Sequence, residues 1–372
     1  MLPKARSGLS LPEVPGLSRR CFSFLLCPLA LLASLIGGQA QERTEDTLRV
    51  RTRVVSVDVL VSDKKTGAPV ADLTRESFEV LADGKRRTVS YFRREGENHR
   101  QPLALVLVID LVGGGAQNYL RRPDILKSLT AALKKLPPED EVAVMANLGG
   151  SNTSLKTLVD FTRDRAKIAE ALEAVPNLPV PGPRWYVDEL RDILQKVEPA
   201  AAARVDSQMI VMPLRTGFGD MSLSERAEIV ARLIRANVLF SPLICDLGQA
   251  YLKMGHVPGK LPTPPRPVFD TIGHLLGRDI YSPEHIAQQT GGENTTVSKP
   301  EDFGAALEKL IASLAARYNL GFTLTENERD DGRMHKLEVR TRVRDSKGKE
   351  RKLMVRARRG YYIPKVEEMP VK

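Results

Sequence analysis

The sequence predicts an α/β fold in which a parallel sheet, covered by helices on both faces, is inserted into an antiparallel β-sandwich built by the two ends of the chain. Two observations support this. Strand and helix patterns alternate between residues 103 and 316, and strand patterns separated by turns flank this region on both sides. Such alternation is typical of parallel strands joined by helical crossovers. Because each flanking set alone would be a marginal sheet, we expect the two sets to pair into one sandwich.

Residues 1–40 are predicted to be a signal peptide. Four basic residues precede an apolar run at 22–36, and Gly38-Gln39-Ala40 offers a small-residue cleavage site. Residues 18–22 also partly match a twin-arginine export signal. The apolar run is shorter than the roughly 20 residues that span a bilayer. We therefore expect an exported protein, periplasmic or extracellular, that meets a membrane only if this segment stays uncleaved.

Residues 41–100 are predicted to form an N-terminal β segment. The runs VVSVDVLVSD and SFEVLADGKRRTVSYF alternate apolar and polar residues, with turn signals at Lys65-Thr66-Gly67 and Ala82-Asp83-Gly84. This combination is typical of antiparallel strands. Residues 74–77 between the two runs are expected to form a short helical turn.

Residues 101–316 are predicted to form the inserted α/β domain. Leu103–Asp110 (LALVLVID) is almost entirely apolar and ends in a carboxylate, as expected of a buried parallel strand. The stretches 175–185 and 251–283 are rich in proline or glycine and are expected to be irregular loops. Further strands are predicted at 141–147, 208–214 and 237–246, and helices at 123–136, 163–174, 186–197, 222–236 and 301–316.

Residues 317–372 return to a strand pattern, with turns at 330–332 and 346–348. The chain carries a formal net charge of +10, and many basic residues lie in its terminal strands. Their alternation predicts one solvated face of a strand, or alternatively a docking surface for an acidic polymer, anionic lipid or acidic partner. Nucleic-acid binding is disfavoured, because export is expected and aromatic residues are only 5% of the chain. The basic residues concerned are Arg49, Arg51, Arg53, Arg340, Arg342, Arg344, Arg351, Lys352, Arg356, Arg358 and Arg359.

These regions, in this order, resemble the secreted von Willebrand factor A-related proteins of acidobacteria and their relatives. The resemblance covers almost all of the chain after residue 40. It implies a Rossmann-like A-domain that binds extracellular partners, usually through Mg²⁺ or Mn²⁺ at the top of the sheet, and it implies no enzymatic activity. The residues that carry it are VDVLVSD (57–63), DLTRESFEVLADG (72–84), the strand into Asp110, Thr290-Gly291-Gly292, YNLGF (318–322) and RARRGYY (356–362).

The metal site that this family implies is largely missing here. The family pattern has an aspartate and two serines after the first strand, a threonine in a second loop and an aspartate in a third. Only Asp110 matches, because Val112 and Gly114 stand at the serine positions, Pro183 at the threonine and Leu214 at the second aspartate. A hard divalent ion requires oxygen ligands, so we expect no metal and no other cofactor. Asp220 or Asp246 could substitute from a neighbouring loop, but their spacing does not require it.

Asp110 then has two alternative roles. Its carboxylate could cap the next helix or accept backbone N–H groups of the following loop. It could also pair with a basic partner or with Arg215. The candidate binding face comprises Asp110, Gly113, Gly114, Gly115, Arg184, Trp185, Arg215 and Asp220.

Enzymatic chemistry is not expected. The sequence has no GxSxG or HExxH motif, and Cys245 lies in an apolar strand where a buried inert thiol is expected. Since Cys21 and Cys27 fall in the predicted signal peptide, no internal disulfide is expected either. We predict an exported, non-enzymatic interaction or adhesion module that binds an extracellular or envelope protein through the loop face of its A-domain. The alternative is a structural component of an envelope complex that docks through its basic β-sandwich.

Overall fold

The computed structural model describes residues 53–94, 101–112, 119–149, 155–179, 186–216, 221–245, 278–279, 282–325 and 327–363. The predicted signal peptide and most of the predicted loop at 251–283 lie outside these residues. Within the described parts of the chain, no helix is both long and apolar enough to cross a membrane.

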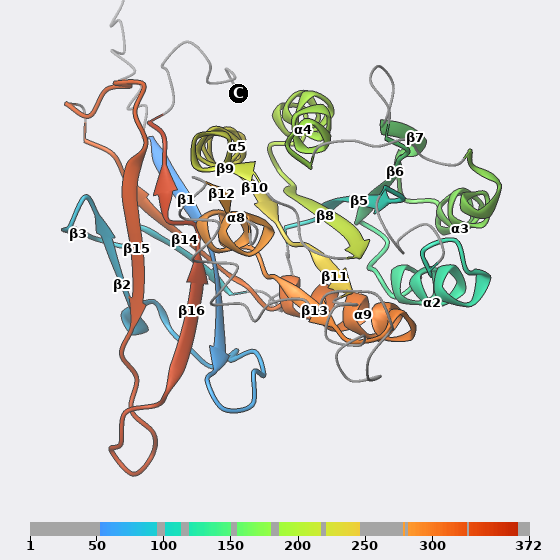
Figure 1. Ribbon diagram of the computed structural model, residues 1–372. Coiled ribbons are helices and arrows are strands. Elements are labelled where there is room, and N and C mark those ends of the chain that lie inside the picture. Colours follow the sequence, from blue (N-terminus) through green and yellow to red (C-terminus); the bar gives the residue numbers. More distant parts are fainter. Residues whose placement is uncertain are drawn as a thin grey trace, which may run out of the picture. The chain divides into compact units, whose positions relative to one another are not determined.

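A seven-stranded sheet forms the centre of the inserted domain, with β5 in its middle and strand order β13-β11-β8-β5-β6-β7, β10 also pairing with β8 (Figure 1). Every pairing is parallel except that of β6 with β7. The order runs outwards from β5 in both directions, as in doubly wound folds, so its topological switch point lies between β5 and β8. The bounds are β5 Leu103–Asp110, β6 Glu141–Asn147, β7 Leu155–Thr162, β8 Gln208–Thr216, β10 Val238–Phe240, β11 Leu243–Cys245 and β13 Thr295–Val297.

Helices cover both faces of this sheet (Figure 1). Strand β5 shows why, because its alternate side chains point to opposite faces and all are buried. Leu105 and Leu107 pack with α2, α3 and α9, whereas Val106 and Val108 pack with α4, α5 and α8. The bounds are α2 Pro123–Leu133, α3 Arg165–Glu173, α4 Tyr186–Ala202, α5 Leu223–Arg235, α8 Ser282–Thr290 and α9 Phe303–Leu314.

The two ends of the chain form the predicted β-sandwich. Its four-stranded sheets, β16-β1-β14-β4 and β17-β15-β2-β3, each combine strands from before and after the inserted domain. The inner faces meet in one core that includes Val57, Val80, Tyr318 and Tyr361. The bounds are β1 Val54–Asp63, β2 Phe78–Ala82, β3 Lys85–Arg87, β4 Tyr91–Arg94, β14 Tyr318–Thr323, β15 His335–Thr341, β16 Leu353–Ala357 and β17 Gly360–Tyr361.

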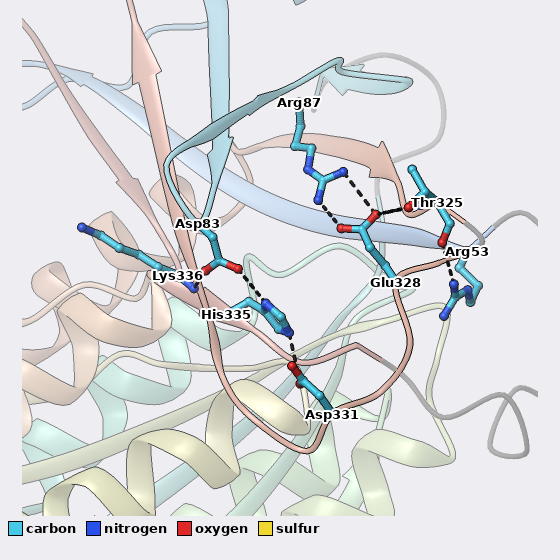
Figure 2. Close-up of polar contacts among 8 residues, drawn as sticks. All are labelled: Arg53, Asp83, Arg87, Thr325, Glu328, Asp331, His335 and Lys336. Atoms are coloured by element: carbon cyan, nitrogen blue, oxygen red, sulfur yellow. Dashed lines mark hydrogen bonds and ion pairs between the residues drawn. The ribbon is translucent and has the colours of Figure 1, made fainter.

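A buried histidine fastens the β2–β3 turn of the sandwich to the loop before β15 (Figure 2). His335 faces Asp83 through Nδ1, at 2.8 Å, and Asp331 through Nε2, at 3.2 Å, and its ring stacks on Tyr361. Asp83 also accepts the backbone N–H of Lys336. The hydrogen bond from His335 is the main cause that lowers the pKa of Asp83.

The sandwich and the inserted domain meet at two of the motifs that carry the family resemblance, Thr290-Gly291-Gly292 and residues 356–362. Gly291 lies so close to β16 that a Cβ on it would stand 2.5 Å from the backbone nitrogen of Arg358. The Arg358 guanidinium donates to Asn237 Oδ1 over 2.9 Å, and the Arg359 N–H donates to the carbonyl of Gln289. We call this contact the joint.

The structure corrects the prediction of a uniformly solvated basic face. Arg340, Arg342 and Arg344 are exposed, as expected for one face of β15 and its extension. Arg53, in contrast, is buried and donates to the carbonyl of Thr325, and Arg358 is engaged at the joint. Arg356 likewise pairs with Glu293 of the inserted domain at 3.5 Å.

Several element predictions also differ from the structure. The antiparallel edge strand β7, the short strand β13 and helix α8 were not expected from the sequence. The single strand expected at 237–246 is divided at Ser241 and Pro242 into β10 and β11. Helix α4 continues past its predicted end to Ala202, with Pro199 inside it.

Candidate functional site

Three neighbouring strands place polar side chains together at the carboxyl edge of the central sheet. Asp110 is the last residue of β5 and pairs in register with Asn147, the last residue of β6. On the other side, Leu214 of β8 pairs with Ile109, so Arg215 follows beside Asp110. This position is the topological switch point, where open α/β sheets bind ligands.

The Asp110 carboxylate is 1% exposed and is held from several directions. Its Oδ1 accepts the backbone N–H of Val112 at 2.9 Å and the amide of Asn147 at 3.2 Å, and its Oδ2 lies 3.4 Å from Nη2 of Arg215. Burial raises the pKa of Asp110, while Arg215 and the two hydrogen bonds act in the opposite direction. Asp110 therefore accepts the backbone N–H of Val112 and pairs with Arg215.

Arg215 bridges two buried carboxylates. Besides Asp110, its Nη1 lies 3.6 Å from Oε2 of Glu189. Glu189 lies in the first turn of α4, where the helix dipole favours a negative charge, and it is 3% exposed. Arg215 itself is 8% exposed, so the whole ion-pair cluster is shielded from water. We call Asp110, Asn147, Glu189 and Arg215 the edge cluster.

The edge cluster does not fit the divalent ion of the family pattern. Its positive charge comes from a guanidinium that lies between the carboxylates of Asp110 and Glu189. Leu214, at the position of the family's second aspartate, is fully buried in the apolar core. Among the described residues, no group of three or more histidine, cysteine, aspartate or glutamate side chains could hold a metal ion.

Arg121 holds the start of the proline-rich segment at 175–185 in place. It is not among the site residues predicted from the sequence. Its guanidinium donates to four carbonyl oxygens, those of Val175, Pro176, Leu178 and Pro179, over distances of 2.7 to 3.3 Å. Arg121 precedes α2, so it connects the loop after β5 to the loop before α4. The only sequence signal was a basic residue just before a helix, which does not reveal carbonyl partners more than fifty positions away.

Other predicted site residues lie outside the described parts of the chain. They are Gly113, Gly114, Gly115, Arg184, Trp185 and Asp220, together with Pro183 and Asp246. Cys245 is fully buried in the apolar core, as predicted for a residue of an apolar strand.

Two residues of the edge cluster, Asn147 and Glu189, were not anticipated from the sequence. Glu189 lies within the helix pattern predicted from residue 186, where an acidic residue in the first turn is ordinary. Its burial against Arg215 depends on how α4 packs on the sheet, which the local sequence does not show.

No protein-family model matches the chain, and no curated protein matches it. Several solved structures are similar to it. BatB from Bacteroides thetaiotaomicron is 13% identical over 57% of this chain and 98% of its own, with a TM-score of 0.37. The manganese-loaded TRAP protein of Plasmodium vivax is 12% identical over 77% of this chain and 98% of its own, with a TM-score of 0.36.

A von Willebrand factor type A protein from Catenulispora acidiphila is 11% identical over 72% of each chain, with a TM-score of 0.40. Likenesses of this size carry no argument about the site or its ligand. The α/β fold, with a Rossmann-like sheet inserted in a β-sandwich, is confirmed by the strand order and packing of this chain itself.

Proposed function

We propose that this protein is an exported, non-enzymatic interaction module that binds a protein partner at the carboxyl edge of its central sheet, without a metal ion. The observation that carries the proposal is the edge cluster, which gathers two carboxylates and a guanidinium at the topological switch point. Because these buried charges pair with one another, we assign the contact with the partner to the loops that follow these strands.

The joint supports the choice of this edge. Gly291 and Arg358 hold the sandwich against the end of α8 and against Asn237, the residue before the short strand β10. Asp110 and Arg215 instead lie at the carboxyl ends of β5 and β8. The sandwich is therefore anchored away from the strand ends where the candidate loops emerge.

Arg121 adds a second reason. By holding the carbonyls of residues 175–179, it orders the segment that precedes the predicted binding residues Arg184 and Trp185 in the chain. A loop that is ordered before binding loses less conformational entropy on association.

The proposal is tested by site-specific photo-crosslinking. A photoreactive residue is placed at Gly114, Trp185 or Asp220, or as a matched control at exposed Arg342 of the sandwich, and the protein is incubated with the envelope fraction of its source cells. We expect the same partner to be crosslinked from the three loop positions and not from the control, with and without EDTA. Crosslinking from position 342 alone would reject the loop face.

The second candidate function, docking through the basic sandwich, is favoured by one observation, the exposed Arg340, Arg342 and Arg344 on and after β15. Of the basic residues near the end of β16, Arg356 and Arg358 contact the inserted domain, whereas Arg359 is exposed. Reversing the charge of Arg342 and Arg344 should abolish association if this candidate is correct, and leave it intact if the loop face binds.

A further inference from the structure

We infer that the guanidinium of Arg215 is the resident cation of the carboxyl edge, standing between Asp110 and Glu189 where a divalent ion would otherwise bind. The inference deepens the proposed function and rests on it for the role of this edge in binding. The cation itself can be tested without any partner.

The charges of the edge cluster require a cation. The side chains of Asp110 and Glu189 are 1% and 3% exposed, and that of Arg215 is 10% exposed. A carboxylate removed from water to this extent is strongly destabilising unless a positive group compensates for it. Arg215 reaches one carboxylate with Nη2 and the other with Nη1, so a single side chain serves both.

The same two oxygens would be the ligands of a metal ion. A bridging Mg²⁺ or Mn²⁺ would need Asp110 Oδ2 and Glu189 Oε2 at about 2.1 Å. These are the oxygens that face the guanidinium, at 3.4 and 3.6 Å from its nitrogens. An ion and the guanidinium cannot occupy this space together, and their positive charges would repel each other.

The remaining polar atoms around Asp110 are already used. Its Oδ1 accepts from Val112 and Asn147, and Asn147 Oδ1 accepts the backbone N–H of Gly149 at 3.2 Å. If Arg215 were shortened, the freed space would be faced by two carboxylate oxygens and filled by water. Carboxylates and water are the ligands that Mg²⁺ and Mn²⁺ accept. Removing the guanidinium should therefore create a divalent-cation site.

The test measures Mn²⁺ binding by the full chain, from the loss of free-ion electron paramagnetic resonance signal, together with the melting temperature in Mn²⁺ or EDTA. Four proteins are compared: wild type, Arg215→Ala, Arg215→Lys, and the double variant Asp110→Asn with Arg215→Ala. We expect wild type and Arg215→Lys to bind no Mn²⁺. The melting temperature of each of these two proteins should be the same in Mn²⁺ as in EDTA.

Arg215→Ala is expected to melt several degrees lower in EDTA, to recover most of that loss in Mn²⁺ and to bind about one ion per chain. The double variant should lose this recovery, because one of the two ligands is neutral. Mn²⁺ binding to wild type that disappears in the double variant would overturn the inference. So would a folded Arg215→Ala that neither loses stability nor binds Mn²⁺.

If Arg215→Ala does not fold even in Mn²⁺, the inference is overturned in its second half, because the ion was expected to restore the site. The wild-type and Arg215→Lys titrations still decide the first half. Failure of the proposed function is distinguishable, since it would remove partner crosslinking at the loop positions without changing the Mn²⁺ results.

Discussion

Replacing Gly291 with alanine should destabilise the protein by about 2–5 kcal/mol through the joint. Gly291 has a φ of +81°, where an L-residue costs about 1–2 kcal/mol. The new Cβ would also stand 2.5 Å from the nitrogen of Arg358 and 2.8 Å from the carbonyl carbon of Ala357. These are backbone atoms that cannot rotate away, so overpacking adds about 1–3 kcal/mol.

Gly348 provides the matched control. Its φ of +76° is similar, but a Cβ there would meet no atom within 4 Å. Gly348→Ala should therefore lose only the stability that a positive φ costs an L-residue, about 1–2 kcal/mol. Urea unfolding followed by circular dichroism measures both losses, and hydrogen exchange of the Arg359 amide reports on the joint directly. Equal losses for the two variants, with unchanged exchange at Arg359, would refute the close approach.

Three further predictions follow from the described contacts. Arg121→Ala should lose about 1–3 kcal/mol of stability and change the emission of Trp185, the only tryptophan. Arg122→Ala should lose clearly less, because the ion pairs of Arg122 with Asp124 and Glu301 are exposed; indistinguishable variants would contradict this. Asp83→Asn keeps a residue tolerated at a φ of 49° but removes the charge beside His335. The pKa of Asp83 is lowered in the folded state, so its charge stabilises the fold above about pH 4. This contribution disappears as the pH falls through the folded pKa. The urea midpoints of wild type and variant should therefore differ at pH 7 and converge in acid. Arg358→Ala should speed hydrogen exchange around Asn237 and Gln289, while Arg342→Ala, which removes an exposed side chain, should not.

The strand into Asp110 shows what the sequence could predict. Its apolar run matches β5 at both ends, because a strand buried on both faces tolerates no polar residue until it leaves the sheet. The sandwich was predictable for a similar reason, since each terminal set of strands has one apolar face that needs cover. Edge strand β7 was missed because LKTLVDFT is only partly buried and lacks a clear alternation.

The partners within the edge cluster could be predicted only in part. Arg215 was one of the alternatives for Asp110, since both follow neighbouring predicted strands. Glu189 and Arg121 were not anticipated, because their contacts depend on the packing of α4 and on the path of residues 175–179. Such pairs are set by tertiary structure, and no local spacing encodes them.

The residues around Gly291 and Arg358, two of the segments that carry the resemblance, acquire a common explanation from the structure. Gly292 must be glycine for a similar reason to Gly291, because its Cβ would stand 2.0 Å from the carbonyl oxygen of Phe240 in β10. The glycines thus let the end of α8 lie against β10 on one side and β16 on the other, and the arginines after β16 close the contact. Strand β10 pairs with the first half of β8, up to Val211. Arg215 lies four positions further along β8. Strand β8 therefore connects the joint with the edge cluster. This chain has space for close packing near one end of β8 and buried charge at the other. This division is expected if the sandwich holds the domain while the carboxyl edge binds.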